Sequence, residues 1–129
     1  MLIPDSHHEL LNGAHTATVS AITPKGQIQT TAIWFLFDAA SGTIQFSTTD
    51  TRKKFRNLSE RADATFFLLD PSNQWSYIEV RGTVTVAPDP ERVTMLAVGA
   101  KHHEDISRFD PPGTNRFTFT LTPTTVNAR

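Results

Sequence analysis

Apolar and polar residues alternate with a period of two in several stretches of the chain, which is the pattern of β-strands that bury one face. Residues 17–21, 75–86 and 117–121 show this alternation most clearly. Gly82 interrupts the second stretch, and a glycine inside a strand indicates a β-bulge or a close approach of another backbone segment. These stretches therefore predict three half-buried strands.

Three further stretches, residues 28–38, 43–48 and 64–69, are apolar runs bounded by turn residues. The run AIWFLF inside 28–38 is apolar on both faces, so we expect both sides of that strand to be covered. Short turns such as the one at 24–26 join several strands, so neighbouring strands should pair antiparallel. We therefore predict one domain over residues 1–129, with six antiparallel strands closed into a barrel that removes exposed edges.

The intervals between the strands predict three helices. A short helix covers residues 7–11, and a basic helix follows the strand at 43–48 with Phe55 and Leu58 as its contacts to the sheet. The third helix runs from the Pro-Asp-Pro sequence at 88–90 to about Lys101. Its buried stripe is expected to contain Val93, Leu96, Ala97 and Ala100.

Composition and charge limit the classes of function. The chain has 129 residues and a net charge of -1, so no overall charge attracts it to nucleic acid or to an anionic membrane. It contains no cysteine, which excludes disulfides, thiolate metal sites and cysteine nucleophiles. No stretch resembles a signal peptide or approaches the roughly 20 apolar residues of a membrane span. We therefore expect a cytoplasmic protein.

The stretch FSTTDTRKKFRNLSER, residues 46–61, indicates a function. A helix start offers free backbone N–H groups and a partial positive charge, which suit a phosphate when hydroxyl groups and cations lie nearby. We expect Thr49 or Asp50 to cap this helix, although a capping carboxylate would compete for the same N–H groups. The alternative is a solvated basic helix face beside a core strand. The hydroxyl groups and cations of the stretch belong to Ser47, Thr48, Thr49, Thr51, Arg52, Lys53, Lys54 and Arg56.

Side chains suited to acid–base, nucleophilic or metal chemistry are sparse. The pairs His7-His8 and His102-His103 lack the i, i+4 spacing that places two metal ligands on one helix face. The sequence has no Gly-x-Ser-x-Gly elbow, no Gly-x-Gly-x-x-Gly fingerprint and no P-loop. We therefore predict no catalytic side chain and no metal site. A bound cofactor would perform the chemistry while the protein orients it.

Two motifs in combination carry a resemblance to a known family. The segment TRKKFRNL at 51–58, followed by WSYIEVRGTV at 75–84, resembles the split β-barrel flavin and deazaflavin oxidoreductases of the pyridoxamine 5′-phosphate oxidase superfamily. The similarity extends from about residue 10 to residue 126 and points more narrowly to the small F420-dependent branch. It implies a mainly β protein with short helices, a six-stranded antiparallel split β-barrel of the FMN-binding type.

The resemblance also implies a homodimer with two cofactor sites at the subunit interface. Residues 30–34 would lie against the ring system of the cofactor, largely through their backbone, and the hydroxyl turn and the cations after it would hold the phosphate. Trp75 and Tyr77 would approach the ring or the tail from the partner strand. The residues that the resemblance assigns to cofactor binding are Thr30, Thr31, Ala32, Ile33, Trp34, Ser47, Thr48, Thr49, Arg52, Lys53, Lys54, Arg56, Trp75 and Tyr77.

The implied activity is that of an F420-dependent oxidoreductase, which transfers hydride from the reduced deazaflavin to a conjugated acceptor such as an enone, a quinone or a tetrapyrrole. The exposed cations Lys25, Lys53 and Arg56 would serve the acidic oligoglutamate tail of F420, and the loop at 102–113 would form the rim of the acceptor pocket. Two alternatives stay open, because a fold alone does not fix a function. One is an FMN-dependent oxidase or reductase of the same fold, and the other is a non-catalytic protein that binds F420, FMN or haem.

Overall fold

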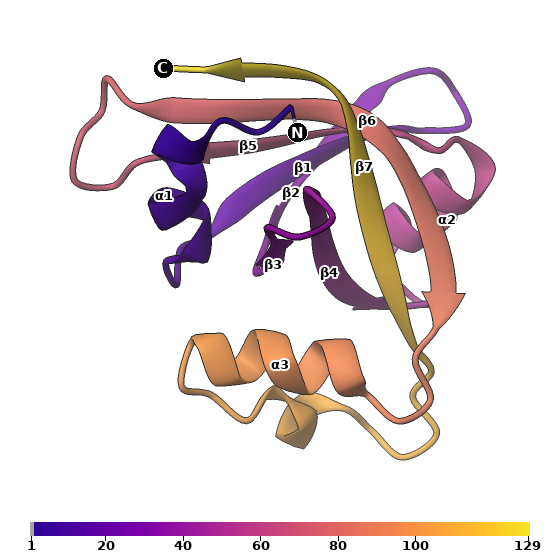
Figure 1. The fold of residues 1–129 in the computed structure, drawn as a ribbon. Coiled ribbons are helices and arrows are strands. Elements are labelled where there is room, and N and C mark those ends of the chain that lie inside the picture. The colour runs from indigo at the N-terminus through magenta and orange to yellow at the C-terminus, as the bar shows by residue number, and fades with distance from the viewer. Residues whose placement is uncertain (1) are drawn as a thin grey trace.

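A computed structural model describes residues 2–129, which form one curled β-sheet with three α-helices (Figure 1). The strands are β1 (Ala17–Ile22), β2 (Ile28–Ile33), β3 (Leu36–Asp38), β4 (Thr43–Thr49), β5 (Asp63–Leu69), β6 (Tyr77–Pro88) and β7 (Arg116–Ala128). The helices are α1 (His8–Asn12), α2 (Lys53–Glu60) and α3 (Val93–Lys101), and 3₁₀ turns cover Asp5–His7 and Ile106–Phe109.

The sheet has the strand order β2-β1-β5-β6-β7-β4-β3, and every neighbouring pair is antiparallel. Strands β6 and β7 are long and bent, so the sheet curls around its core like one half of a barrel (Figure 1). Strands β2 and β3 are the two edges of the sheet. This architecture confirms the predicted mainly β, antiparallel fold of the split-barrel type.

The structure has seven strands rather than the predicted six, because the expected strand at 28–38 is broken. Strand β2 pairs with β1, whereas β3 pairs with β4 on the far side of the sheet. The chain changes partner at Trp34 and Phe35, and the Phe35 side chain is fully buried at this crossing. A run that is apolar on both faces carries no periodic signal for such a break.

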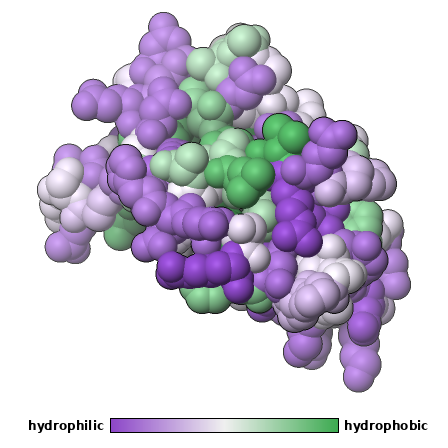
Figure 2. All heavy atoms as spheres, turned by 90° about the horizontal axis from the view of Figure 1, so that it is seen from below, coloured by the Kyte–Doolittle hydropathy of each residue, from purple (hydrophilic) through white to green (hydrophobic). Residues whose placement is uncertain are grey.

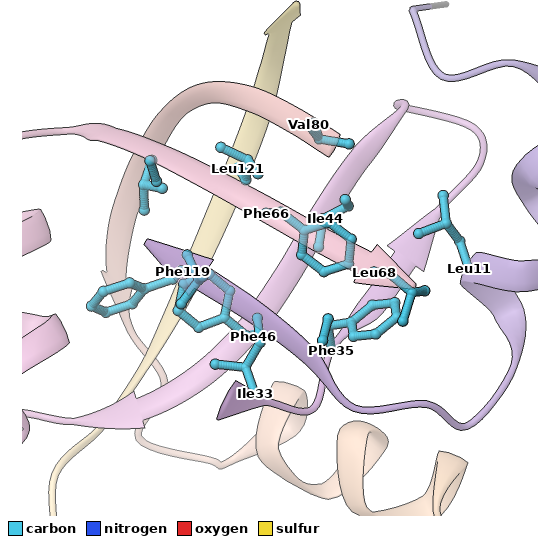
Figure 3. Packing of buried hydrophobic residues seen from close by; sticks show 14 of the residues in the cluster. Leu11, Ile33, Phe35, Ile44, Phe46, Phe66, Leu68, Val80, Phe119 and Leu121 are labelled. Atoms are coloured by element: carbon cyan, nitrogen blue, oxygen red, sulfur yellow. The ribbon is translucent and has the colours of Figure 1, made fainter. Parts of the chain in front are cut away.

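Side chains from the inner face of the curled sheet meet in one hydrophobic core (Figure 3). Phe35, Phe46, Phe66 and Phe119 are among its fully buried members, and the ring of Phe35 meets that of Phe66 edge-on with 4.9 Å between centroids. The inward faces predicted from the alternation in 17–21 are confirmed, since every second residue there is buried.

Gly82 lies at a shift of register between β6 and β7, as its position in the pattern predicted. A Cβ atom at Gly82 would overlap the backbone carbonyl group of Thr122, so the close approach requires glycine. Pro123 pairs with Gly82 at this bulge, and β7 continues beyond it to Ala128. Strand β7 therefore passes through Pro123 without ending there, because a bulge is one of the places where a strand tolerates proline.

Helix α2 attaches to the core as expected. Leu58 is buried and Phe55 packs against the core cluster, where its ring lies 4.7 Å from that of Phe117. The expected cap is wrong, because the helix begins after Arg52 and neither Thr49 nor Asp50 caps it.

Helix α3 lies beneath the sheet near β4 (Figure 1). Its buried residues are Thr94, Met95, Val98 and Gly99. The predicted stripe is wrong, because the members expected to be buried, including Val93 and Leu96, are exposed instead. Figure 2, which views the molecule from the α3 side, shows hydrophobic atoms near the middle of this face with hydrophilic atoms around them. Among residues 2–129, no helix has the length and apolar character needed to cross a bilayer.

Candidate functional site

A cleft of about 670 Å³ opens where three parts of the chain approach one another. Its walls are the edge strand β2 at Thr31 and Ala32, the end of β4 with the start of α2 at 47–54, and the segment 109–116 that leads into β7. The cleft therefore lies at the split of the half-barrel, beside the place where the sequence predicted a phosphate.

The hydroxyl turn at the end of β4 is well ordered by its own contacts. Thr48 and Thr49 are buried, and the hydroxyl groups of Thr49 and Thr51 lie 2.8 Å apart. The Asp50 carboxylate accepts a hydrogen bond of 3.2 Å from the side-chain amide of Asn115 and does not cap α2. The Asp50 carboxylate therefore does not compete with a phosphate for the N–H groups at the start of this helix.

Three cations surround the cleft. Arg52 and Lys54 come from the start of α2, and Arg116 begins β7. Burial lowers the pKa of Lys54 below its ordinary value, and the nearby charges of Arg52 and Arg116 lower it further. None of the ion pairs within residues 2–129 involves Arg52 or Lys54. An anion in the cleft would relieve this repulsion between like charges.

Arg116 has a carboxylate partner that fixes its orientation. Its Nε and Nη2 atoms donate to the two carboxylate oxygens of Asp110, at 2.8 and 2.6 Å. Its third nitrogen, Nη1, lies 3.5 Å from the hydroxyl oxygen of Ser47. Arg92 approaches the same carboxylate at 4.0 Å. The hydrogen bonds from Arg116 hold the pKa of Asp110 below its ordinary value, against the opposing effect of burial.

The wall formed by β2 offers backbone groups rather than charges. β2 is an edge of the sheet, so the side of its backbone away from β1 has no strand partner. Thr31 and Ala32 line the cleft along this edge. Unpaired N–H and C=O groups at an edge can bind the alternating donors and acceptors of a planar heterocycle.

A basic groove continues from the cleft past the start of α2. A hollow of about 280 Å³ beside Lys54 shares Lys53 and Gln29 with a further hollow of about 590 Å³, which Lys25 and Arg56 also line. At its base the buried Asn57 donates a hydrogen bond of 2.6 Å to the side-chain carbonyl of Gln29. Asn57 thus forms a bridge between α2 and β2, which explains its burial.

The remaining residues assigned from the sequence lie outside the cleft of a single chain. Ile33 is buried in the core, and the hydroxyl group of Thr30 bonds that of Ser20 at 2.8 Å. The Trp34 indole donates to the Thr16 hydroxyl at 3.1 Å, and its ring stacks on His102 at 3.8 Å.

Trp75 and Tyr77 are also outside the cleft. Trp75 is exposed in the connection between β5 and β6, and Tyr77 begins β6 with its ring stacked on Phe67 at 5.7 Å. Their predicted role depends on a second subunit. No group of three or more histidine, aspartate or glutamate side chains within residues 2–129 is arranged to hold a metal ion.

Sequence reasoning missed Arg116 and Asp110. Arg116 precedes the last alternating stretch and carries no motif. It reaches the site because β4 pairs with β7, which places it opposite Thr49 at the end of the hydroxyl turn. Only knowledge of this strand pairing, which joins segments more than sixty residues apart, would have identified it.

A family model described as pyridoxamine 5′-phosphate oxidase matches residues 3–129. The chain belongs to this family. A solved structure named F420 reductase is 26% identical, with a TM-score of 0.86 over 97% of this chain and 98% of that one. No relative among curated proteins matches the chain.

Other members of the pyridoxamine 5′-phosphate oxidase fold are more distant. A pyridoxamine 5′-phosphate oxidase-related, FMN-binding protein from Nostoc punctiforme is 15% identical, with a TM-score of 0.72 over 99% of this chain and 86% of that one. A haem-binding protein from Mycobacterium smegmatis is 14% identical, with a TM-score of 0.71 over 100% of this chain and 55% of that one. These two similarities concern the fold alone.

Proposed function

We propose that this protein is an F420-dependent oxidoreductase that reduces a conjugated small molecule such as an enone, a quinone or a tetrapyrrole. The observation that carries the proposal is the cleft that joins three cations to an open strand edge and continues into a second basic groove. The similarity to the protein named F420 reductase, which extends over nearly the whole of both chains, supports it further.

Each part of the cleft has a separate task in this proposal. The hydroxyl turn at 47–49, the start of α2 and the cations Arg52 and Lys54 hold a phosphate. The backbone of β2 at Thr31 and Ala32 holds the ring system in register with that phosphate. When bound, reduced F420 supplies the hydride. The protein contributes orientation and exclusion of water, and the acceptor takes its proton from solvent.

The second basic groove favours F420 over FMN as the cofactor. FMN ends at its phosphate, whereas F420 carries a chain of glutamates beyond it. Lys25, Lys53 and Arg56 line the groove beyond the phosphate position and bring no carboxylate with them. A polycarboxylate tail would lie along these cations, with charge attraction that weakens at high salt.

We also propose that the protein acts as a homodimer. Phe67 and Leu69 of β5 project from the outer face of the sheet, opposite to the buried Phe66 and Leu68, and both are substantially exposed. Tyr77 pairs with Leu69 on this outer face. A second subunit that covers it would bring its own aromatic residues to the strands that carry the ring-binding edge.

The cleft is a poor match for haem. Haem iron in proteins is held by histidine, cysteine, methionine or tyrosine, and none of the side chains that line the cleft in residues 2–129 is of these types.

A direct titration tests the proposed cofactor. We expect purified protein to bind F420 more tightly than FMN, measured by the fluorescence of each chromophore at matched ionic strength. Binding of FMN with equal or greater affinity would contradict the proposal, as would failure to bind either one. A yellow preparation with a flavin spectrum would support the FMN alternative, and tight F420 binding without turnover of any acceptor would support a non-catalytic binder.

A variant tests the position of the site. Replacing Arg52, Lys53 and Lys54 together with alanine should weaken F420 binding by about tenfold or more, because charge-assisted hydrogen bonds to the phosphate are lost. Thermal unfolding should change little, because Arg52 and Lys53 are exposed and the half-buried Lys54 is repelled by neighbouring positive charges. An affinity equal to that of the wild type would show that the phosphate lies elsewhere.

A further inference from the structure

We propose that Arg116 is a phosphate-binding residue of the cleft and that Asp110 is its positioning residue. The inference rests on the proposed function only in requiring that the cleft takes a phosphate-bearing cofactor. Nothing in the sequence motifs or in the family similarity assigns a role to either residue. The contacts of the guanidinium group carry the proposal.

The guanidinium of Arg116 is held along one edge by Asp110 and reaches the Ser47 hydroxyl with its remaining nitrogen. Asp110 accepts from Nε and Nη2 in a two-point contact, which fixes the plane and rotation of the group. Nη1 takes no part in that contact and lies beside the Ser47 hydroxyl, at the phosphate end of the cleft. An arginine has five N–H donors, so its unshared donors remain for an anion at this point.

Burial makes the Arg116–Asp110 pair rigid and poorly solvated. The side chain of Arg116 is 14% exposed and that of Asp110 is 5% exposed. In such surroundings, charge-assisted hydrogen bonds are stronger than on an open surface, and a guanidinium is oriented before its ligand arrives. The low pKa of Asp110 keeps the carboxylate charged, and so the pair intact, well below neutral pH.

The other cations of the cleft indicate the same ligand. Arg52, Lys54 and Arg116 all line the cleft, and the charges of the two arginines lower the pKa of Lys54. Asp110 is committed to Arg116 and Arg92 and does not neutralise Lys54. An anionic phosphate placed among Ser47, Lys54 and Arg116 would satisfy donors from both sides of the cleft.

The Arg116–Asp110 pair also links the bound phosphate to the wall of the cleft that is formed by the segment before β7. Asp110 lies in the segment 109–115, which forms that wall, whereas Ser47 and Lys54 belong to the sheet and to α2. A phosphate bound to Arg116 would therefore connect the segment to the barrel through Asp110.

The test compares each chromophore with its phosphate-free counterpart, and the readout is the ratio of the two dissociation constants. FMN with riboflavin is the pair that differs by the phosphate alone. F420 with the deazaflavin that ends in a ribityl alcohol differs by the phosphate and the glutamate tail together, so for this pair only the change that a variant causes relative to the wild type is compared. We expect Arg116→Ala to reduce the preference of the wild type for the phosphorylated form by about tenfold or more, while affinity for the phosphate-free form stays within about twofold. A general disturbance of the structure would weaken both forms equally.

Two further variants separate charge from orientation. Arg116→Lys should recover less than half of the lost preference on a logarithmic scale, because an ammonium cannot reproduce the two-point contact with Asp110. Asp110→Asn should lower the preference by about threefold or more. If the Asp110 carboxylate only neutralised Arg116, removal of its charge would raise the preference for the phosphorylated form. That result would overturn its positioning role. Arg108→Ala serves as the matched control, since Arg108 is exposed and pairs with Glu104 outside the cleft.

The outcomes distinguish this inference from the proposed function. A wild type that preferred the phosphorylated form of neither chromophore would overturn both. A wild type with a clear preference that Arg116→Ala retained would overturn the role of Arg116 alone. A wild type that bound FMN more tightly than F420, and whose preference for FMN over riboflavin was abolished by Arg116→Ala, would overturn the proposed cofactor and uphold the role of Arg116.

Discussion

Lys101 ends α3 with its ammonium group enclosed by the fold. Its Nζ atom donates to the carbonyl oxygens of Leu11 at 2.9 Å and Phe35 at 3.1 Å, and it lies 4.1 Å from the centroid of the Phe35 ring. The contact ties the end of α3 to the end of α1 and to the break between β2 and β3. Burial lowers the pKa of Lys101 from 10.5 to about 8.

The lowered pKa of Lys101 predicts how stability depends on pH. Between pH 8 and 10.5 the unfolded chain holds a proton on Lys101 that the folded chain has released, so the free energy of unfolding rises with pH in this window. One pKa unit corresponds to about 1.4 kcal/mol, and partial exposure of the side chain reduces the gain to roughly 1–2 kcal/mol. The free energy of unfolding can be measured with urea for the wild type and for Lys101→Met at several pH values. As the pH rises, it should increase in the wild type relative to the variant. Lys25→Met, in an exposed turn, controls for the loss of one lysine, and a difference independent of pH would contradict the prediction.

Helix α3 shows why an apolar sequence does not reveal which face of a helix is buried. Residues 93–100 contain apolar side chains on every side, so a period of 3.6 fits more than one stripe. Contacts outside the helix decide between them. Thr94 accepts a hydrogen bond of 2.7 Å from the hydroxyl group of Thr118, and a Cβ atom at Gly99 would collide with the Glu104 carbonyl. Asp89 fixes the start of the helix by accepting from the N–H groups of Val93 and Thr94.

Alanine substitutions at neighbouring positions test this orientation of α3. Met95→Ala should lower the free energy of unfolding by about 2–5 kcal/mol, because Met95 is fully buried and its loss leaves a cavity. Leu96→Ala should change it by less than about 1 kcal/mol, since Leu96 is exposed. Chemical denaturation of the two variants under identical conditions provides the measurement. A larger loss of stability in Leu96→Ala than in Met95→Ala would instead support the buried stripe that was expected from the sequence.

The elements that the sequence predicted best are those in which one face alone is apolar. The strands at 17–21 and 117–121 and the bulge at Gly82 follow directly from alternation and from the close approach of backbones. The break at Trp34-Phe35 has no such signal, because the run is apolar at every position. The expectation that both of its faces are covered is wrong for a single chain, in which Ile33 and Phe35 are buried but Ala32 is exposed. The same limit applies to the candidate site, where the hydroxyl turn is local in sequence but Arg116 depends on the pairing of β4 with β7.

At the scale of the whole molecule, two apolar surfaces remain exposed on one chain. The outer face of the sheet carries Phe67 and Leu69, which are 37% and 45% exposed, beside the half-buried Tyr77. The face of α3 carries Val93 and Leu96, which are 63% and 48% exposed. Exposed apolar clusters on soluble proteins commonly mark contacts with partners. The two surfaces therefore compete as the site of the proposed contact between subunits.

The position of the cofactor strand favours the sheet face for that contact. Ala32 pairs with Thr18, and Thr18 pairs with Phe67, so these three residues lie side by side on the outer face of the sheet. The strand that lines the cleft thus continues the apolar surface of β5. A partner that covers Phe67 would also lie against β2, the strand proposed to hold the ring. Trp75 and Tyr77 of a second subunit could then reach a site that they do not line in their own chain.

We therefore expect a dimer whose contact is sensitive to charge at the sheet face. Replacing Phe67 and Leu69 together with lysine should convert the protein to a monomer in light-scattering measurements across a range of concentrations. The same double replacement at Val93 and Leu96 should leave the dimer intact. Because the site would lose a neighbouring subunit, F420 affinity should fall in the first variant, whereas the second should bind as the wild type does. A dimer lost through the α3 variant, or a wild type that is monomeric at every concentration, would place the ring-binding edge in solvent and contradict a cofactor site shared between subunits.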